Sequence, residues 1–320
     1  GKLLALSEAG MPYALPDDLE TPGIHDFGGR LRGAMTAHPF LDPVSGEMVF
    51  YRYRPDAPPY LTVFVADKAG AIVAERTVDT GLPYMIHDVA VTARKIVFVL
   101  APIVFDLEGR RQGKPFLAWR PDLGTRIAIL DRSDLHGPVT WLDADPFFVF
   151  HFLNAYDERD AVVIDYVRHA AFNDTHGKAP PQMARMTIAG RSIEHTTTAS
   201  PAIEFPRHDD RLRGLKHRYG YAATVARGKN GAVLRFDRKD GGVLAHDFGA
   251  DKEVGEPIFV PAAGHGAETD GWVLVYVYDR KSDRSDLAVL DARDFAAAPV
   301  ATVHLPRRVP HGLHGNWMEI

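Results

Sequence analysis

The feature of this sequence that most limits its fold is a series of short apolar segments rich in Val, Ile, Phe, Tyr and Thr. Examples are MVFYRY at 48–53, LTVFVA at 61–66, IVFVL at 96–100, PFFVFHFL at 146–153, AVVIDYV at 161–167, AVLRF at 232–236 and WVLVYVY at 272–278. Such segments predict β-strands, and turn sequences such as KDGG at 239–242 predict the connections. No stretch keeps a 3.6-residue periodicity for more than three turns. The chain is therefore expected to be all-β, as a sandwich, a barrel or a propeller.

The composition allows a large core and excludes several kinds of site. Hydrophobic residues make up 46% of the chain and charged residues 25%, which is ordinary for a globular protein. Since all-β domains can be large, we expect a single domain over residues 1–320. The sequence has no cysteine, which excludes disulfides, thiolate catalysis, iron–sulfur clusters and thiolate zinc sites. Any transition metal must therefore be held by His, Asp or Glu.

Charge and hydropathy patterning narrow the partners and the compartment. The net charge is −5 and there is no basic block, so we expect no nucleic-acid partner. The longest apolar run, at 95–105, is too short and too interrupted by proline to span a bilayer, and no signal peptide is visible. We therefore expect no membrane span and a cytoplasmic location.

Three histidines recur at intervals that fit the repeat of a β-propeller. The stretches 36–50, 85–99 and 148–164 each place a histidine shortly before a polar segment and a strand. His38 and His87 are 49 residues apart, and His87 and His151 are 64 apart, whereas a four-stranded blade takes roughly 40–50 residues. Equivalent positions on successive blades converge on the propeller axis, so these imidazoles are expected to point at one site.

Four of the 15 histidines stand out by their surroundings: His38, His87 after the apolar PYMI, His151 inside PFFVFHFLNAY, and His314 between glycines in VPHGLHGNW. A buried imidazole must satisfy both ring nitrogens, so His151 is either a core residue bonded to a backbone carbonyl or a metal ligand. Neutral imidazoles suit Fe, Zn, Cu and Ni, and the four together favour an all-histidine site. Most other histidines are expected to be solvated or capped: His25, His136, His169, His176, His195, His208, His217, His246, His265 and His304.

Three glutamates lie beside apolar residues, where an unpaired buried carboxylate is costly. Glu8 lies in LLALSEAGMPYAL, Glu204 in PAIEFPRH and Glu256 in VGEPIFVP. Each of them either faces water at a strand edge or accepts the N–H of a metal-bound imidazole and fixes its tautomer. The presence of three such glutamates beside four such histidines favours the second interpretation.

These residues belong to longer stretches in which the sequence resembles the carotenoid cleavage oxygenases, a family that includes the bacterial lignostilbene dioxygenases. The matching stretches run through the whole chain: LLALSEAGMPYAL, DFGGRL, TAHPFLDPVSGEM, PYMIHDVAVT, FLAWRPDLGTRIAIL, DADPFFVFHFLNAYDE, EFPRHDDR, RYGYA, GEPIFVP and VPHGLHGNWM. The resemblance implies a seven-bladed β-propeller with a dome of loops over the face that holds the iron. It also implies one non-haem Fe(II) with four histidine ligands, which fall here on His38, His87, His151 and His314.

The same resemblance places the three glutamates that hold the ligand imidazoles on Glu8, Glu204 and Glu256. In the tail it assigns the ligand to His314, and we expect His311 to be a supporting or solvent-facing residue. Gly312 and Gly315 lack the Cβ that would crowd the approach of the tail to the site.

The sequence departs from the family pattern in two respects. Family members carry a substantial segment before GKLLAL, so the N-terminal part of the ring is expected to be missing from this chain. In the lignostilbene branch a lysine that holds the substrate phenol precedes the first glutamate, whereas this chain has Ser7. Ser7 therefore argues against a stilbene cleaver that grips a phenolate.

The resemblance implies oxidative cleavage of a carbon–carbon double bond in a conjugated apolar alkene, an apocarotenoid or a stilbene, with O2 giving two carbonyl products. Four imidazoles leave two open positions on an octahedral iron. Two alternatives remain: an isomerising relative that binds iron, and a non-catalytic propeller scaffold. The candidate residues of an apolar substrate tunnel are Ser7, Phe40, Phe105, Phe116, Trp119, Phe152 and Leu313.

Overall fold

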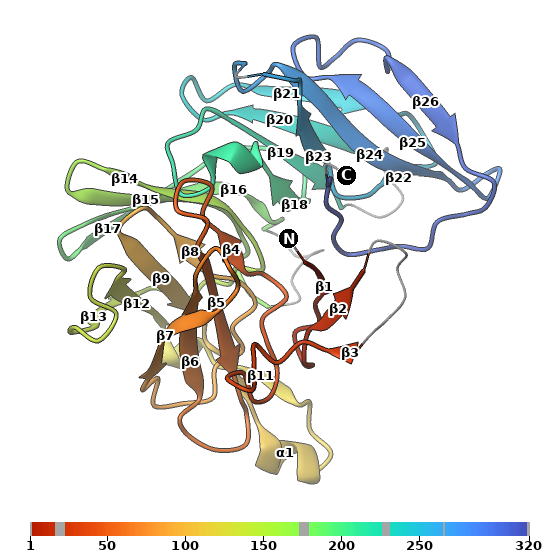
Figure 1. Ribbon diagram of the computed structural model, residues 1–320. Helices are drawn as coiled ribbons and strands as arrows, with labels where there is room; N and C mark the ends of the chain where they lie inside the picture. Colours follow the sequence, from red (N-terminus) through yellow and green to blue (C-terminus); the bar gives the residue numbers. More distant parts are fainter. Residues whose placement is uncertain (1, 17–22, 173–178, 226–230, 265, 319–320) are drawn as a thin grey trace. The chain divides into compact units, whose positions relative to one another are not determined.

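The computed structural model describes residues 2–16, 23–172, 179–225, 231–264 and 266–318 (Figure 1). Strands dominate these residues, and helical structure is limited to α1 (Leu107–Arg111) and two single 3₁₀ turns. The expectation of an all-β chain is therefore confirmed. No helix in the described part of the chain is long and apolar enough to cross a membrane. The chain divides into two compact units, Gly1–Phe150 and His151–Ile320, here called the N-terminal and C-terminal units.

The N-terminal unit contains three sheets of antiparallel strands and one hairpin. The first sheet has three strands: β1 (Leu3–Ala5), β2 (Tyr13–Leu15) and β3 (Gly23–Ile24). The second has the order β4 (Phe40–Leu41), β5 (Met48–Tyr53), β6 (Leu61–Ala66) and β7 (Ile72–Val78). The third has the order β8 (Ala90–Val91), β9 (Lys95–Leu100), β12 (Thr125–Asp131) and β13 (Thr140–Ala144). The hairpin of β10 (Ile103–Phe105) and β11 (Leu117–Trp119) is inserted between β9 and β12.

The C-terminal unit contains three further antiparallel sheets. The first has the order β14 (Phe152–Glu158), β15 (Ala161–Arg168), β16 (Gln182–Ala189) and β17 (Ser192–Thr197). The second has the order β18 (Ile203–Arg207), β19 (Tyr219–Thr224), β20 (Ala232–Asp237) and β21 (Val243–Asp247). The third has the order β22 (Lys252–Val254), β24 (Gly271–Asp279), β25 (Arg284–Asp291) and β26 (Ala301–His304), and β23 (Ile258–Pro261) also pairs with β24.

Burial across the sheets explains their sequences. The second strand of a sheet, such as β9 or β15, is buried on both faces and reads as a continuous apolar run. The fourth strand, such as β17 or β26, is largely exposed and polar. An exposed edge strand of this kind is short or polar, which limits pairing with other chains. The gradient from a buried inner strand to an exposed outer strand is what a propeller blade requires.

Sheets of three to five antiparallel strands, connected mostly in chain order, are the blades of a β-propeller. The described residues form six such blades, so the expectation of seven is wrong for this chain. A blade takes roughly 40–50 residues, and the apolar segment at 103–105 joins a hairpin inserted into one blade and does not begin another. A single domain over 1–320 and a dome of loops remain predictions.

Candidate metal centre

The four histidines singled out above come from loops at the beginnings of blades and from the tail, residues 309–318. His38 lies just before β4, His87 just before β8 and His151 directly before β14. These are the first strands of three consecutive four-stranded sheets. His314 comes from the tail, which follows β26. The repeated placement accounts for the spacing of these three histidines in the sequence, because each precedes the first strand of its blade.

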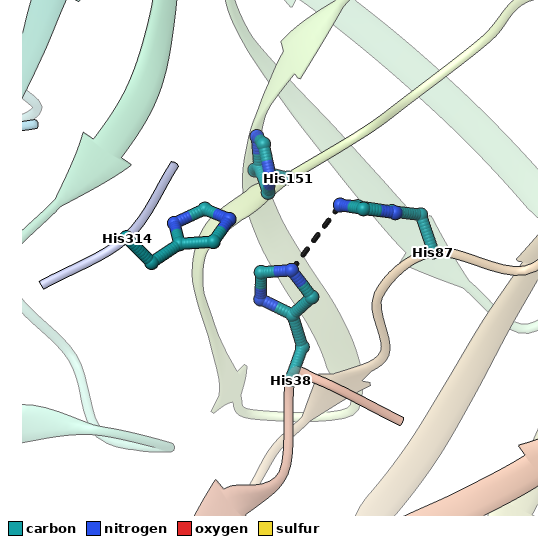
Figure 2. Close-up of side chains that lie close together, drawn as sticks. All are labelled: His38, His87, His151 and His314. Atoms are coloured by element: carbon teal, nitrogen blue, oxygen red, sulfur yellow. Dashed lines mark hydrogen bonds between the residues drawn. The ribbon is translucent and has the colours of Figure 1, made fainter. Parts of the chain in front are cut away.

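In the N-terminal unit, two imidazoles face each other beside a carboxylate. Nε2 of His38 lies 3.2 Å from Nε2 of His87, as the dashed line in Figure 2 shows. Nδ1 of His87 lies 3.0 Å from Oε2 of Glu8, and the Tyr53 hydroxyl donates to Oε1 of the same carboxylate at 2.8 Å. If Nδ1 of His87 carries the proton and donates it to Glu8, its Nε2 keeps the lone pair that a metal ion requires.

Tyr53 holds Glu8 as a protonated phenol. Burial and the neighbouring Glu8 carboxylate raise the pKa of Tyr53, so its hydroxyl remains a donor at neutral pH. The Tyr53 ring stacks on Phe105 at a centroid distance of 5.6 Å, and Phe105 contacts Phe116 at 5.0 Å. The Tyr53 ring thus belongs to an aromatic group with Phe105 and Phe116.

In the C-terminal unit, His151 is held by the buried carboxylate of Glu204. Nδ1 of His151 lies 2.7 Å from Oε2 of Glu204, and Nε2 of His169 lies 2.6 Å from Oε1. Burial alone would raise the pKa of Glu204, but His151 and His169 outweigh it and lower the pKa to about 2. Glu204 is therefore an ionised acceptor shared by two histidines.

The backbone next to Glu204 adopts an uncommon conformation. Phe205 has a φ of +58°, and the pairing of β18 with β19 shifts register between Glu204 and Arg207. This local bulge lets the Phe205 N–H donate to Oε2 of Glu204 at 2.8 Å. The Phe205 ring lies 5.7 Å from that of His151 and 5.6 Å from that of His314. A bulky residue with positive φ is rare and is typical of functional sites.

The tail brings His314 to the third carboxylate. Nδ1 of His314 lies 3.0 Å from Oε1 of Glu256, and the Gly315 N–H donates to Oε2 at 2.8 Å. Arg207 lies 3.2 Å from the same carboxylate and donates to the Gly315 carbonyl. Burial alone would raise the pKa of Glu256, but the bond from His314 and the charge of Arg207 outweigh burial and lower it. The rings of His314 and His151 are 4.8 Å apart and nearly perpendicular.

His311 has a different carboxylate partner from His314. Its Nε2 lies 2.6 Å from Oε2 of Glu253, and its side chain is mostly exposed. His311 and His314 are three residues apart, and so are Glu253 and Glu256. The contacts His311–Glu253 and His314–Glu256 therefore pair the tail with the segment 253–256 in a single alignment. His311 therefore helps to align the tail.

Figure 2 shows the four candidate ligand side chains, His38 and His87 of the N-terminal unit and His151 and His314 of the C-terminal unit, each of which offers a ring nitrogen that could bind a metal ion. In three of them Nδ1 lies within 3.0 Å of a glutamate oxygen. Carboxylates in this position orient a ligand imidazole and strengthen it as a donor. Imidazole nitrogens of this kind are donors that suit borderline transition metals.

The candidate tunnel residues are placed less uniformly. Phe40 packs against the core of the N-terminal unit, whereas Leu313 in the tail is exposed. Phe152 lies beside Tyr166, Trp119 lies in β11, and Ser7 accepts the Gly10 N–H in a turn. Phe105 and Phe116 are the two that contact each other.

Several histidines expected to be solvated are buried. His169, His208, His217 and His246 are at most 7% exposed, so the expectation is wrong for them. Each lies where blades of the C-terminal unit pack, and local sequence does not reveal that packing. His176 and His265 lie outside the described residues.

Sequence reasoning also missed Tyr53, His169 and Arg207, which hold the three carboxylates. Arg207 could have been found from the sequence, because it lies in the same EFPRHDDR stretch as Glu204. No local sequence pattern indicates a role for Tyr53 or His169, which lie at the ends of apolar strands.

An all-β chain of propeller blades with a carboxylate-supported histidine group defines a propeller protein with a candidate metal site. Residues 1–319 match the family model described as retinal pigment epithelial membrane protein. The chain belongs to this family, which includes the carotenoid cleavage oxygenases, and the resemblance seen in the sequence is confirmed.

Individual relatives agree with this assignment. The chain is 31% identical to carotenoid 9,10(9',10')-cleavage dioxygenase 1 of Arabidopsis thaliana, over 98% of this chain and 64% of that protein. The crystal structure of Pseudomonas brassicacearum lignostilbene dioxygenase matches with a TM-score of 0.89 and 30% identity, over 99% of this chain and 73% of that one. The crystal structure of a cobalt-substituted apocarotenoid oxygenase from Synechocystis matches with a TM-score of 0.88 and 28% identity. The match covers 100% of this chain and 72% of that one. The chain thus spans about two thirds to three quarters of these relatives' lengths.

Proposed function

We propose that this protein is an Fe(II)-dependent oxygenase that cleaves a carbon–carbon double bond of a conjugated apolar alkene with O2 and releases two carbonyl products. The observation that carries the proposal is the set of imidazoles whose Nδ1 atoms lie against glutamate oxygens, which leaves Nε2 for a metal. Relatives named for the cleavage of carotenoids and for lignostilbene dioxygenation support the reaction class.

In this proposal one Fe(II) is held by His38, His87, His151 and His314. The distance of 3.2 Å between the Nε2 atoms of His38 and His87 supports it. Two imidazole nitrogens this close together could both contact one metal ion. The iron would supply the activation of O2 at the positions that the four nitrogens leave open.

The protein's own groups would set the geometry and exclude water. Glu8, Glu204 and Glu256 orient the imidazoles, and their three negative charges offset the charge of the ion. A tunnel under a dome of loops would hold the alkene in an apolar environment. We assign its walls to Ser7, Phe40, Phe105, Phe116, Trp119, Phe152 and Leu313. The contact of Phe105 with Phe116 supports the assignment for these two.

The residue that precedes Glu8 supports a narrower substrate class. Ser7 directly precedes Glu8, where a cation would be needed to hold a phenolate. A neutral hydroxyl there favours an uncharged alkene, such as an apocarotenoid or a non-phenolic stilbene. We also propose a cytoplasmic location, which cell fractionation with a membrane-protein control would test.

The experiment is to load the purified protein with Fe(II) without oxygen, measure bound iron by ICP-MS, and then supply labelled O2 with a panel of apocarotenoids and stilbenes. We expect one iron per chain and one labelled oxygen atom in each carbonyl product. The His304→Ala variant is a matched control, because His304 is an exposed histidine paired with an aspartate, Asp286.

Each negative result has a distinct meaning. A protein that binds no iron would be a scaffold, which would overturn the proposal. A protein that binds iron and rearranges a double bond without taking up label would be an isomerase, which would overturn the reaction but not the metal site.

A further inference from the structure

Glu204 differs from the other two carboxylates in what holds its second oxygen. Its Oε2 accepts from His151 Nδ1 and from the Phe205 N–H, and its Oε1 lies 2.6 Å from Nε2 of His169. The side chain of Glu204 is 8% exposed and that of His169 is 1% exposed. Water therefore has little access to replace a lost donor at Oε1.

His169 is placed for this contact by two neighbouring sheets. It directly follows β15, whereas Glu204 lies in β18, the first strand of the next sheet. Because an ionised carboxylate only accepts hydrogen bonds, Nε2 of His169 must carry the proton that it donates. The bond thus fixes one tautomer of His169 and ties Glu204 to the end of the adjacent blade.

We propose that His169 is a positioning residue, which holds the Glu204 carboxylate in the direction that orients His151 as a metal ligand. Because both oxygens are engaged, a rotation of the carboxylate away from His151 would break the contact with His169 as well. Loss of the donor at Oε1 would leave a buried acceptor unsatisfied and free the carboxylate to rotate toward another donor. This inference rests on the metal site of the proposed function.

The other two carboxylates show that a second side-chain donor is a shared device. Tyr53 donates to Oε1 of Glu8, and Arg207 lies against Oε2 of Glu256. The side chain of Glu8 is 27% exposed, so water can substitute for Tyr53. Water has less access to Glu204. We therefore expect the loss of His169 to weaken metal binding more than the loss of Tyr53.

Two substitutions with the same chemistry but different reach test the role. In His169→Gln the side-chain amide nitrogen can reach the position of Nε2 and still donate to Glu204. In His169→Asn the amide ends about one bond short, near the position of Nδ1. His169→Phe removes the donor and keeps the ring.

The measurement is the Fe(II) dissociation constant, obtained by competition with a chelator, together with the EPR spectrum of the ferrous nitrosyl adduct. We expect His169→Asn and His169→Phe to weaken Fe(II) binding by about 10–100-fold, as for other partners of ligand histidines. His169→Gln should stay close to wild type in both measurements. A purely structural role would lower the melting temperature of all three variants without separating Gln from Asn.

The outcomes separate this inference from the proposed function. If the wild type binds no Fe(II), both are overturned. If the wild type binds Fe(II) and the Asn and Gln variants bind it equally well or equally poorly, only the role of His169 is overturned. His195→Phe serves as the control, because it removes a histidine bonded to Tyr166 and leaves Glu204 untouched. If His169→Phe does not fold, the Asn and Gln pair still decides the question.

Discussion

The two compact units bury different polar side chains. In the described part of the N-terminal unit, the buried polar residues are all threonines: Thr36, Thr62, Thr80, Thr92 and Thr125. In the C-terminal unit they include ionisable groups: His151, Asp165, His169, Glu204, His208, Asp209, His217 and His246. Buried ionisable groups are costly unless they are paired, and breaking one pair leaves an uncompensated group. The C-terminal unit should therefore be the more sensitive to polar substitutions and to acid.

The largest difference in stability between the two units is expected from the substitution of Asp165. It is fully buried, and Arg185 and Arg238 both donate to it at 2.6–2.9 Å. Asp165→Asn should lower the free energy of unfolding by about 3–5 kcal/mol, because Arg238 would be left buried without a counter-charge. Urea denaturation measures the effect.

The matched control is Asp131→Asn in the N-terminal unit, where Asp131 pairs with the partly exposed Lys95 at 2.7 Å. A surface pair contributes at most about 1 kcal/mol. Equal losses in the two variants would contradict the proposed difference between the units.

The second-largest expected effect is the loss of folding stability at acidic pH. Burial lowers the pKa of His217 to about 4; the charges of Arg185 and Arg238 lower it further, and the charge of Asp165 opposes them. Burial, and next the neighbouring His217, lower the pKa of His208 well below its usual value. Below pH 6.5 the unfolded histidines bind protons that the folded ones do not. Stability should therefore fall as the pH drops from about 6.5 to 4, by up to about 1.4 kcal/mol per pH unit for His217 alone.

Urea titrations at pH 7, 6 and 5 test this dependence. His217→Gln should flatten the slope, because the amide does not titrate in this range. An unchanged slope in that variant would assign the acid sensitivity to other groups.

The glutamates that hold the candidate ligands extend the comparison to metal binding. Glu204→Gln should weaken Fe(II) binding by about 100-fold and Glu8→Gln by about 10-fold, the two ends of the range for such groups. The reason for the difference is that Glu8 is 27% exposed and Glu204 is 8% exposed, so water replaces the lost acceptor more readily at Glu8. Chelator competition gives both constants, with Glu194→Gln on the outer strand β17 as the control.

The smallest effect is expected at His311. Its bond to Glu253 aligns an exposed tail, and other contacts, such as that of Arg207 with Gly315, hold the tail as well. His311→Ala should therefore weaken Fe(II) binding only a few-fold, within the range of a single exposed pair. His314→Ala should abolish binding. Loss of iron in His311→Ala alone would reverse the assignment of the ligand.

The sequence was sufficient for the strand content, whereas the residues assigned to the candidate metal group stay a prediction. Both depend on local signals: alternating or continuous apolar runs for the strands, and the apolar or glycine-rich surroundings of His151 and His314. The family resemblance assigned the three glutamates, and that assignment also stays a prediction. The number of blades was taken from the family resemblance, which implies seven, whereas the described residues form six and the chain spans only part of its relatives' length.

The buried polar network could not be predicted either. His208 and His217 stand in polar stretches of sequence and His169 follows the apolar strand β15, and nothing in these local patterns indicates that all three are buried. The same limit applies to Tyr53, since nothing in MVFYRY indicates that its hydroxyl reaches Glu8 from 45 residues away. Contacts between side chains distant in the sequence require the fold.

The left-handed backbone at Phe205 has a consequence for how the protein can be engineered. A glycine would adopt this conformation without steric strain. The same change would delete the ring that contacts both His151 and His314. Selection for heat tolerance alone would thus not protect the aromatic wall beside two ligands, so a thermostability screen on this scaffold should exclude that position.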